Sequence, residues 1–186
     1  MAEDWKKKLE NFWYYHKKQV LILCLALFLF SYAGYLLAQE EPEPVLYGEA
    51  VNLEISETDQ AVFCKRALEY LELDDGENRI FLGTGMHIDV QNPEKNALTG
   101  SLENISVQIF SHELDFLVCP ESVMDYFAEL GALEETDNSV YGVLANSFFS
   151  ESETMHEEDI WFCILKNSEK KEYVRQMKKM LEGEAK

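Results

Sequence analysis

Cysteine is scarce in this chain, which has four among its 186 residues. Small secreted domains that are held together by disulfides carry many more, so a disulfide scaffold is excluded. Cys24 lies inside a long apolar run, and Cys64, Cys119 and Cys163 each lie in a shorter one. We expect the thiols of Cys64, Cys119 and Cys163 to be buried and unreacted, acting as small apolar side chains. Outside the long run at most one bridge can form, and Cys119 with Cys163 is the pair to test first.

Positive charge is scarce beyond the first 18 residues. From Gln39 onward the chain has 11 Lys and Arg against 32 Asp and Glu, a net charge of −21. Such a surface repels phosphate groups, so nucleic acid and anionic lipid are not expected to bind this part of the chain. A soluble acidic surface is the simplest explanation. A surface that collects cations or binds a basic partner is the alternative.

Recognisable motifs of enzymes are missing as well. The sequence has no nucleophile elbow, no zinc-ligand pair and no phosphate-binding loop. Gly83-Thr84-Gly85 lacks the further glycines or the lysine of a nucleotide site. We therefore predict a protein that is not an enzyme, with no catalytic residue, no cofactor and no metal ligand.

Two polar groupings offer weaker signals. His87 and Asp89 would share one face of a strand, where they could act on a metal or a proton, but no third ligand accompanies them. Ser111-His112-Glu113 cannot form a triad with itself, because adjacent side chains point apart, so we predict a helix-to-strand turn there.

Two acidic stretches contain oxygen ligands of the kind that calcium prefers. The first is the segment 151–159, which holds Glu151, Glu153, His156, Glu157, Glu158 and Asp159, and the second is the turn 74–78. Neither has the spacing of a twelve-residue calcium loop. We expect a solvated acidic loop, with divalent-cation binding as the alternative.

The longest uncharged stretch comprises residues 19–39 and is made mostly of Val, Leu, Ile, Phe and Ala. As a helix, residues 20–38 would rise about 28 Å, close to the ~30 Å hydrocarbon core of a bilayer. Trp13, Tyr14 and Tyr15 precede the stretch, as aromatic residues do at a membrane interface. The sequence therefore predicts a transmembrane helix over 19–39 that contacts the lipid bilayer.

Charges on either side of this stretch predict its orientation. Five lysines precede it, whereas the residues that follow are acidic, and no Lys or Arg recurs before Lys65. By the positive-inside bias, the N-terminus is cytoplasmic and the bulk of the chain lies outside the cell membrane. One alternative is a signal peptide cleaved after Ser31-Tyr32-Ala33, although the apolar run continues beyond it. A lipoprotein anchored at Cys24 is the other, although Cys24 sits early in the run.

Four segments follow from these patterns. Residues 1–18 form a basic and aromatic cytoplasmic leader, 19–39 the transmembrane helix, 40–44 an acidic linker with two prolines, and 45–186 one extracytoplasmic domain. The domain has enough residues for a real core but too few for two large lobes. An extended linker of this length holds the domain within roughly 20 Å of the bilayer.

Hydrophobic periodicity predicts alternating strands and helices in this domain. We expect strands at 51–55, 80–82, 86–90, 114–119, 140–145 and 160–165, with 114–119 central and buried. We expect helices at 58–73, 96–111 and 120–131, and a last one capped by Ser168. Their expected buried faces comprise Val62, Ala67, Leu68 and Leu71; Leu98, Leu102, Ile105 and Ile109; Val123, Tyr126, Phe127 and Leu130; and Tyr173, Val174, Met177 and Leu181. This order predicts an α/β sandwich with a mixed or mostly parallel sheet.

Three segments, 114–133, 137–144 and 164–181, resemble parts of type 2 periplasmic-binding-protein-like domains, which are extracellular solute-binding domains. The layout of leader, span and domain also resembles uncharacterised single-pass membrane proteins of clostridia-like bacteria. The resemblance implies a domain like one lobe of a periplasmic binding protein. Those proteins close two lobes around a ligand, and this chain has residues for little more than one. No ligand-binding residue is therefore transferred by position.

These observations support three functional hypotheses. The first is a non-enzymatic, membrane-anchored binding or assembly module of the bacterial cell envelope, with another envelope protein as its partner. The second is a tethered solute-binding receptor that serves a transporter or a sensor and binds a small molecule in a concave pocket. The third is an extracytoplasmic hydrolase, which would require His87, Asp89 and a distant nucleophile to converge.

Overall fold

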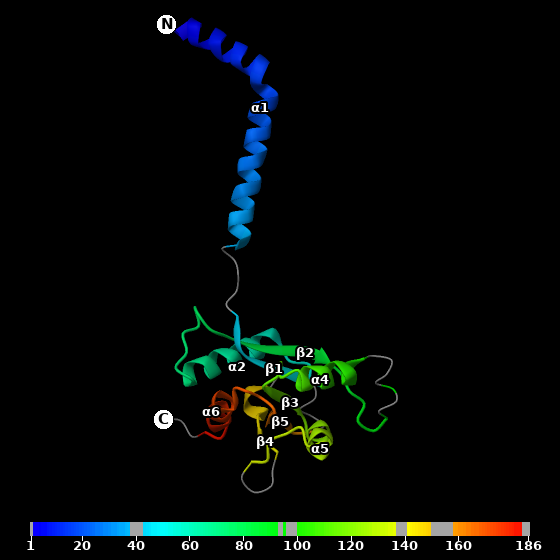
Figure 1. Cartoon of the computed structure of the whole chain (residues 1–186). Helices are drawn as coiled ribbons and strands as arrows, with labels where there is room; N and C mark the ends of the chain where they lie inside the picture. Colours follow the sequence, from blue (N-terminus) through cyan, green and yellow to red (C-terminus); the bar gives the residue numbers. More distant parts are fainter. Residues whose placement is uncertain are drawn as a thin grey trace. The chain divides into compact units, whose positions relative to one another are not determined.

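The computed structural model describes residues 2–37, 43–92, 95, 100–136, 141–149 and 158–183. The chain divides into two compact units, Met1–Glu41 and Pro42–Lys186, and each is described by itself (Figure 1). The predicted linker falls mainly on residues outside the described ranges. Pro44, which was expected to close that linker, is the first residue of a strand.

The first unit consists of helix α1 (Ala2–Leu37). Within it, Phe12–Tyr35 is long and apolar enough to cross a membrane, and none of the most apolar part is buried by other residues. A helix of 24 residues rises about 36 Å, more than the hydrocarbon core requires. A signal sequence near an N-terminus meets the same criteria of length and composition. The predicted end of the span at residues 38 and 39 lies outside the described residues.

The described part of the second unit contains a five-stranded mixed sheet in the order β2-β1-β3-β5-β4. The strands are β1 (Pro44–Val51), β2 (Arg79–Met86), β3 (Phe116–Pro120), β4 (Gly142–Leu144) and β5 (Ile160–Ile164). β1 is parallel to β2 and β3, whereas β5 is antiparallel to β3 and β4. The predicted α/β class with a mixed sheet is confirmed. The prediction of a buried central strand is also confirmed, because every residue of β3 is buried.

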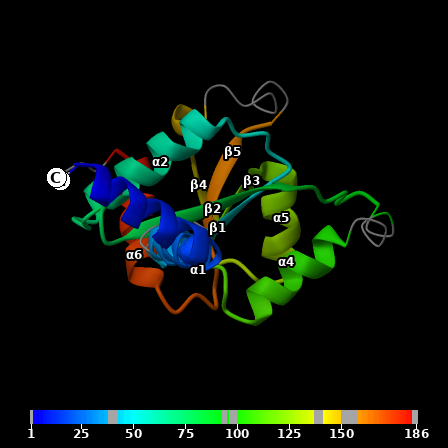
Figure 2. The same ribbon diagram turned by 90° about the horizontal axis from the view of Figure 1, so that it is seen from above.

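Helices cover both faces of this sheet (Figure 2). α2 (Glu57–Tyr70) and α6 (Lys171–Leu181) pack on one face, and α4 (Ser101–Phe110) and α5 (Glu121–Glu129) pack on the other. A short 3-10 helix, η1 (Asn146–Phe148), follows β4. The chain runs from β1 through α2 to β2, and then through α4 back to β3 on the other side of β1. The connections therefore change direction at β1.

Each face has its own hydrophobic core. Under α2 and α6, Phe63 lies at the centre of an aromatic cluster, with its ring 5.2 Å from that of Phe149 and 6.4 Å from that of Phe162. Under α4 and α5, Ile105 and Phe127 pack with Leu117 and other residues of the second cluster. Two cores form because β1, β3 and β5 are covered on both faces. Strands of this kind need continuous apolar runs rather than alternating apolar and polar residues.

Several helix boundaries agree with local sequence signals. Ser56 caps α2, since its hydroxyl accepts a hydrogen bond from the Asp59 backbone N–H at 3.1 Å. Pro120 immediately precedes α5, and Gly131, with φ of +69°, follows its end. Helices α2 and α5 thus occupy the ranges expected from the sequence, 58–73 and 120–131, with small differences at their ends.

The expected strand at 51–55 is wrong. The strand is β1, which ends at Val51, and Leu53 and Ile55 belong to the connection that leads to α2. The alternation was misleading because it belongs to the end of β1 and a connection, in which Val51 and Leu53 are buried and Glu54 is exposed, and this pattern does not require a strand. The expected strand at 86–90 is also wrong: β2 continues through Gly83 and Gly85 and ends at Met86.

Three assignments of buried side chains are wrong as well: Val62, Leu130 and Tyr173, which is 39% exposed. On α2, Val62 is 43% exposed and Phe63 is fully buried, because the helix presents a different face to the sheet. On α5, Leu130 is 61% exposed and Met124 is buried instead. Ser168 does not cap α6, whose N-cap is Lys170 without a side-chain bond. The Ser168 hydroxyl accepts a hydrogen bond from the Lys170 backbone N–H at 3.0 Å and donates to Asp115 at 2.6 Å.

Candidate functional site

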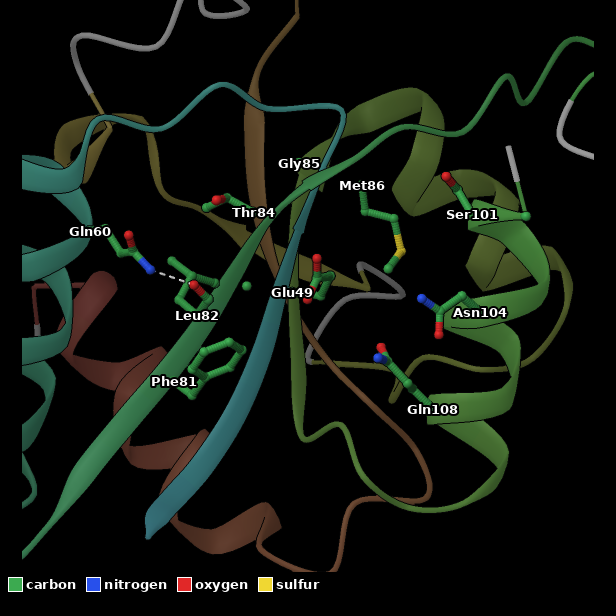
Figure 3. A pocket seen from close by; sticks show the side chains of 12 residues that line it. Glu49, Gln60, Phe81, Leu82, Thr84, Gly85, Met86, Ser101, Asn104 and Gln108 are labelled. Carbon is green, nitrogen blue, oxygen red and sulfur yellow. Dashed lines mark hydrogen bonds between the residues drawn. The ribbon is translucent and has the colours of Figure 1, made fainter. Parts of the chain in front are cut away.

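A cavity of about 630 Å³ lies where β1, β2 and α4 meet, and Gln60 of α2 also reaches its wall (Figure 3). The volume is in the range of small-molecule sites. The cavity adjoins the last residues of β1 and β2 and the first residue of α4. Ligands of open α/β sheets commonly bind beyond the carboxyl ends of strands, near a change in connection direction.

Glu49 is the only charged side chain that lines this cavity among the described residues. It lies near the end of β1, where Gly48 and Ala50 face the first core and Glu49 faces α4 (Figure 3). Glu49 is only 7% exposed. Among the described residues, its carboxylate has neither a hydrogen bond nor an ion pair. Burial raises the pKa of Glu49 from 4.5 to about 7, since the charged form is poorly solvated there.

Glycine on β2 makes room for this carboxylate. Gly83 is the register partner of Glu49, and a Cβ atom on Gly83 would overlap the Glu49 carboxylate. Gly85, two residues along, has φ of +89°, a conformation that other residues rarely adopt. Gly83-Thr84-Gly85 therefore does not form a nucleotide loop. It lies in strand β2, and because the two glycines have no side chains, they leave space for the cavity.

The opposite wall is polar and comes from one face of α4. Ser101, Asn104 and Gln108 follow each other at spacings of three and four, and they line the cavity (Figure 3). Ile105 and Ile109, on the other side of the helix, are buried in the second core. The Oε1 atom of Gln108 is buried without a hydrogen-bond partner among the described residues. The cavity thus contains a second polar group that a ligand could satisfy.

A second cavity of about 430 Å³ shares Glu49, Phe81 and Gln108 with the first. Lys170 also lines it, and the Lys170 ammonium lies 5.6 Å from the centre of the Tyr47 ring. Glu49 therefore lines both cavities, which lie along strands β1 and β2.

Asp115 is the other buried carboxylate near this site, and it differs from Glu49 in being fully bonded. The Tyr47 backbone N–H donates to it at 3.0 Å, and the Ser168 hydroxyl donates at 2.6 Å. Asp115 joins β1, the start of β3 and the segment before α6. Its bonds identify a structural role, whereas Glu49 has no structural partner.

No protein-family model, curated protein or solved structure matches this chain. The resemblance to periplasmic-binding-protein-like domains therefore stays a prediction. The function must be argued from the site itself.

His87 and Asp89 both line a cavity of about 500 Å³ with Asn52 and Lys95, but no third metal ligand joins them among the described residues. Both residues follow the end of β2 and belong to no strand. Asp89 accepts hydrogen bonds from the backbone N–H groups of Gln91 at 3.1 Å and Asn92 at 2.9 Å, and it lies 3.4 Å from Lys95. The Asn92 backbone bond lowers the pKa of Asp89 most strongly. Asp89 therefore organises a turn.

The other sequence-based candidates are used in local structure or lie outside the described residues. His112 lies in the turn after α4, as expected, and its Nδ1 atom lies 2.7 Å from the Asn167 carbonyl oxygen. Residues 151–157 of the acidic segment are not described. Glu158 accepts bonds from the backbone N–H and the hydroxyl of Ser122, at 3.1 and 2.8 Å. Across the described ranges, no three His, Cys, Asp or Glu residues are grouped for a metal ion.

All four cysteines are free thiols. Cys119 and Cys163 are fully buried on adjacent antiparallel strands, where Cys119 opposes Trp161 and Cys163 opposes Leu117. The two cysteines are thus offset diagonally. Burial, and then the contact with Cys119, raises the pKa of Cys163 well above its usual value. Burial also raises the pKa of Cys64, to about 11.

Sequence reasoning missed Glu49, Gln60, Asn104 and Gln108. A signal for Glu49 was present: it is the single charged residue in the run 45–51. A charge inside a buried strand is costly and is often functional. The polar residues of α4 lie opposite its apolar stripe. Any surface helix has such a polar face, so the sequence did not single these residues out.

Proposed function

We propose that this chain is a membrane-anchored, non-enzymatic binding module of the bacterial cell envelope. In this proposal α1 crosses the membrane with its lysine-rich start in the cytoplasm, and the α/β domain lies outside. The length and apolar composition of Phe12–Tyr35 support the anchor. The charge difference between the leader and the residues from 39 onward supports the orientation.

The observation that carries the binding role is the unpartnered Glu49 carboxylate in its cavity. A buried carboxylate without a partner destabilises a domain, so a residue of this kind is more readily explained by a ligand than by folding. A concave polar site favours a tethered solute-binding receptor, in which the domain presents a solute to a transporter or a sensor. The neighbouring Gln108 Oε1 atom and the space left by Gly83 also support this role.

The test is a solute panel with a variant that displaces the Glu49 carboxylate in the cavity. The full chain, in non-ionic detergent micelles, would be unfolded thermally with amino acids, sugars, peptides and nucleotides. A solute at 100 times its dissociation constant adds about 2.7 kcal/mol. For a domain of this size, this should raise the unfolding midpoint by roughly 5–10 °C. Gly83→Ala should abolish that increase. If no solute changes the midpoint of the wild type, the receptor proposal is wrong.

An apolar surface on α4 and α5 favours a second candidate function, assembly with another envelope protein. Phe110 is 86% exposed and Leu130 is 61% exposed, and both line a hollow whose other walls include Ile109 and Phe127. Exposed apolar groups of this size often mark protein interfaces. Site-specific photocrosslinking from position 110 in intact cells should capture one defined partner, which Leu130→Asp should abolish. A crosslinking pattern that Leu130→Asp leaves unchanged would contradict this role.

A further inference from the structure

We infer that the Glu49 cavity binds a small solute carrying a protonated amine, with the ammonium group on the Glu49 carboxylate and on Gln108 Oε1. This inference rests on the proposed function, because it takes the cavity to be the binding site and names the class of ligand. Figure 3 shows Glu49 and Gln108 on opposite sides of the open space, with Asn104 beside Gln108.

Glu49 has no countercharge among the described residues. It is nine-tenths buried, and Lys170 is the Lys or Arg side chain that lines a described cavity together with it. The Lys170 ammonium lies over the Tyr47 ring at 5.6 Å and forms no ion pair with Glu49. A ligand cation would therefore supply the partner that the described residues do not.

The other titratable groups along this site do not neutralise Glu49 either. His112 lies against the Asn167 carbonyl oxygen at 2.7 Å. Glu113 and Asp115, which line the second cavity, are acidic and make the site more attractive to a cation. No titratable side chain of β2 or α4 lines the first cavity. Among the described residues, Lys170 is the one Lys or Arg lining the second cavity, against three carboxyl groups, so the local charge favours a cation.

The cavity also contains hydrogen-bond acceptors that suit an ammonium group. An ammonium group has three N–H donors and no acceptor. The carboxylate of Glu49 and the buried, unbonded Oε1 of Gln108 are acceptors within one cavity. Gln60 Nε2 uses one of its two N–H groups on the Leu82 carbonyl oxygen. The two buried acceptors match a donor cation.

Coordination chemistry argues against a divalent metal at the same place. Calcium takes six to eight oxygen ligands, often from several carboxylates. The first cavity has one carboxylate, and the described residues contain no cluster of three acidic, His or Cys ligands. One ammonium group would be enough to neutralise the single negative charge of Glu49.

The inference also predicts a direction of pH dependence. The carboxylate must be ionised to hold a cation, and burial raises the pKa of Glu49 to about 7. Most primary amines remain protonated well above this pH. Lowering the pH from 8 to 6 reduces the ionised fraction of free Glu49 about tenfold, so the affinity for an amine should fall about tenfold.

The experiment uses the full chain in dodecyl maltoside micelles and ligand-observed NMR titration. The probes are n-butylamine and ethanolamine, with 1-butanol and acetate as uncharged and anionic comparisons. The variants are Glu49→Gln, which keeps the shape and removes the charge, and Gly83→Ala, whose added methyl group overlaps the Glu49 carboxylate and displaces it. Glu129→Gln is the matched control, because it removes the same charge from an exposed position on α5.

We expect both amines to bind the wild type and Glu129→Gln equally, and to bind Glu49→Gln at least tenfold more weakly. 1-Butanol and acetate should not bind. Equal binding of n-butylamine and 1-butanol, or unchanged amine binding by Glu49→Gln, would overturn the inference. Binding of acetate that Gly83→Ala abolishes would also overturn it, while leaving the cavity as the binding site. The proposed function fails separately, if no solute of the wider panel raises the unfolding midpoint of the wild type in a way that Gly83→Ala abolishes.

Discussion

At the residue scale, Glu49 should make the stability of the domain depend on pH. Its pKa is about 7 in the folded protein and 4.5 in the unfolded chain. The folded state therefore holds the proton more tightly, and stability falls as the pH rises from about 4.5 to 7. Below this window both states are protonated, and above it both are ionised. Allowing for solvent at the cavity, the loss should be roughly 1–3 kcal/mol.

Glu49→Gln should remove most of this loss, because the amide has no charge to desolvate. We expect the variant to be more stable than the wild type at pH 8 by roughly 1–3 kcal/mol and nearly equal to it at pH 4.5. Urea unfolding of residues 42–186 at several pH values measures this, with Glu129→Gln as the control. Parallel pH profiles for the wild type and Glu49→Gln would show that Glu49 does not titrate in this way.

Asp115 leads to the opposite expectation, because it is a buried carboxylate with partners. Asp115→Ala should lower the free energy of unfolding by roughly 2–4 kcal/mol, since it leaves the Tyr47 N–H and the Ser168 hydroxyl without their acceptor. Ser168→Ala should cost only about 1 kcal/mol. Urea unfolding compares the two variants, and an effect of Ser168→Ala as large as that of Asp115→Ala would contradict this account.

At the element scale, the orientation of α2 decides which neighbouring residue stabilises the fold. Phe63→Ala should cost about 3–5 kcal/mol, because it empties the aromatic cluster with Phe149 and Phe162. Val62→Ala should change stability by less than about 0.5 kcal/mol, because Val62 is largely exposed. Chemical denaturation measures both. Equal costs for the two substitutions would support the helix face expected from the sequence instead.

At the scale of the whole molecule, the proposed anchor and orientation predict a defined topology. If the lysine-rich leader is cytoplasmic as proposed, protease added to intact cells should digest the domain and leave an N-terminal tag protected. Immunoblots against tags at both ends follow the two parts. Protection of the domain until the membrane is permeabilised would reverse the orientation. Release of a shortened, soluble domain would show that the apolar run is a cleaved signal sequence.

Particular elements explain how far sequence reasoning could go. Residues 114–119 and 160–165 were recognised as buried strands, because an apolar run too short for a helix leaves few alternatives. Ser56, Pro120 and Gly131 marked helix ends through local hydrogen bonds and backbone conformations, which depend little on the rest of the chain. In contrast, Val62 and Phe63 are neighbours with similar hydrophobicity. Only the position of the sheet determines which of them is buried.

The sequence by itself determined the long apolar helix, the acidity of the remainder, the alternation of strands and helices and the ends of several helices. Each of these depends on composition, on periodicity or on contacts between residues close in the chain. The tertiary structure alone decided the candidate site, because Glu49, Gly83 and Gln108 come from three segments that the sheet and α4 bring together. Whether a carboxylate is partnered or isolated depends on distant residues, and no local pattern contains that information.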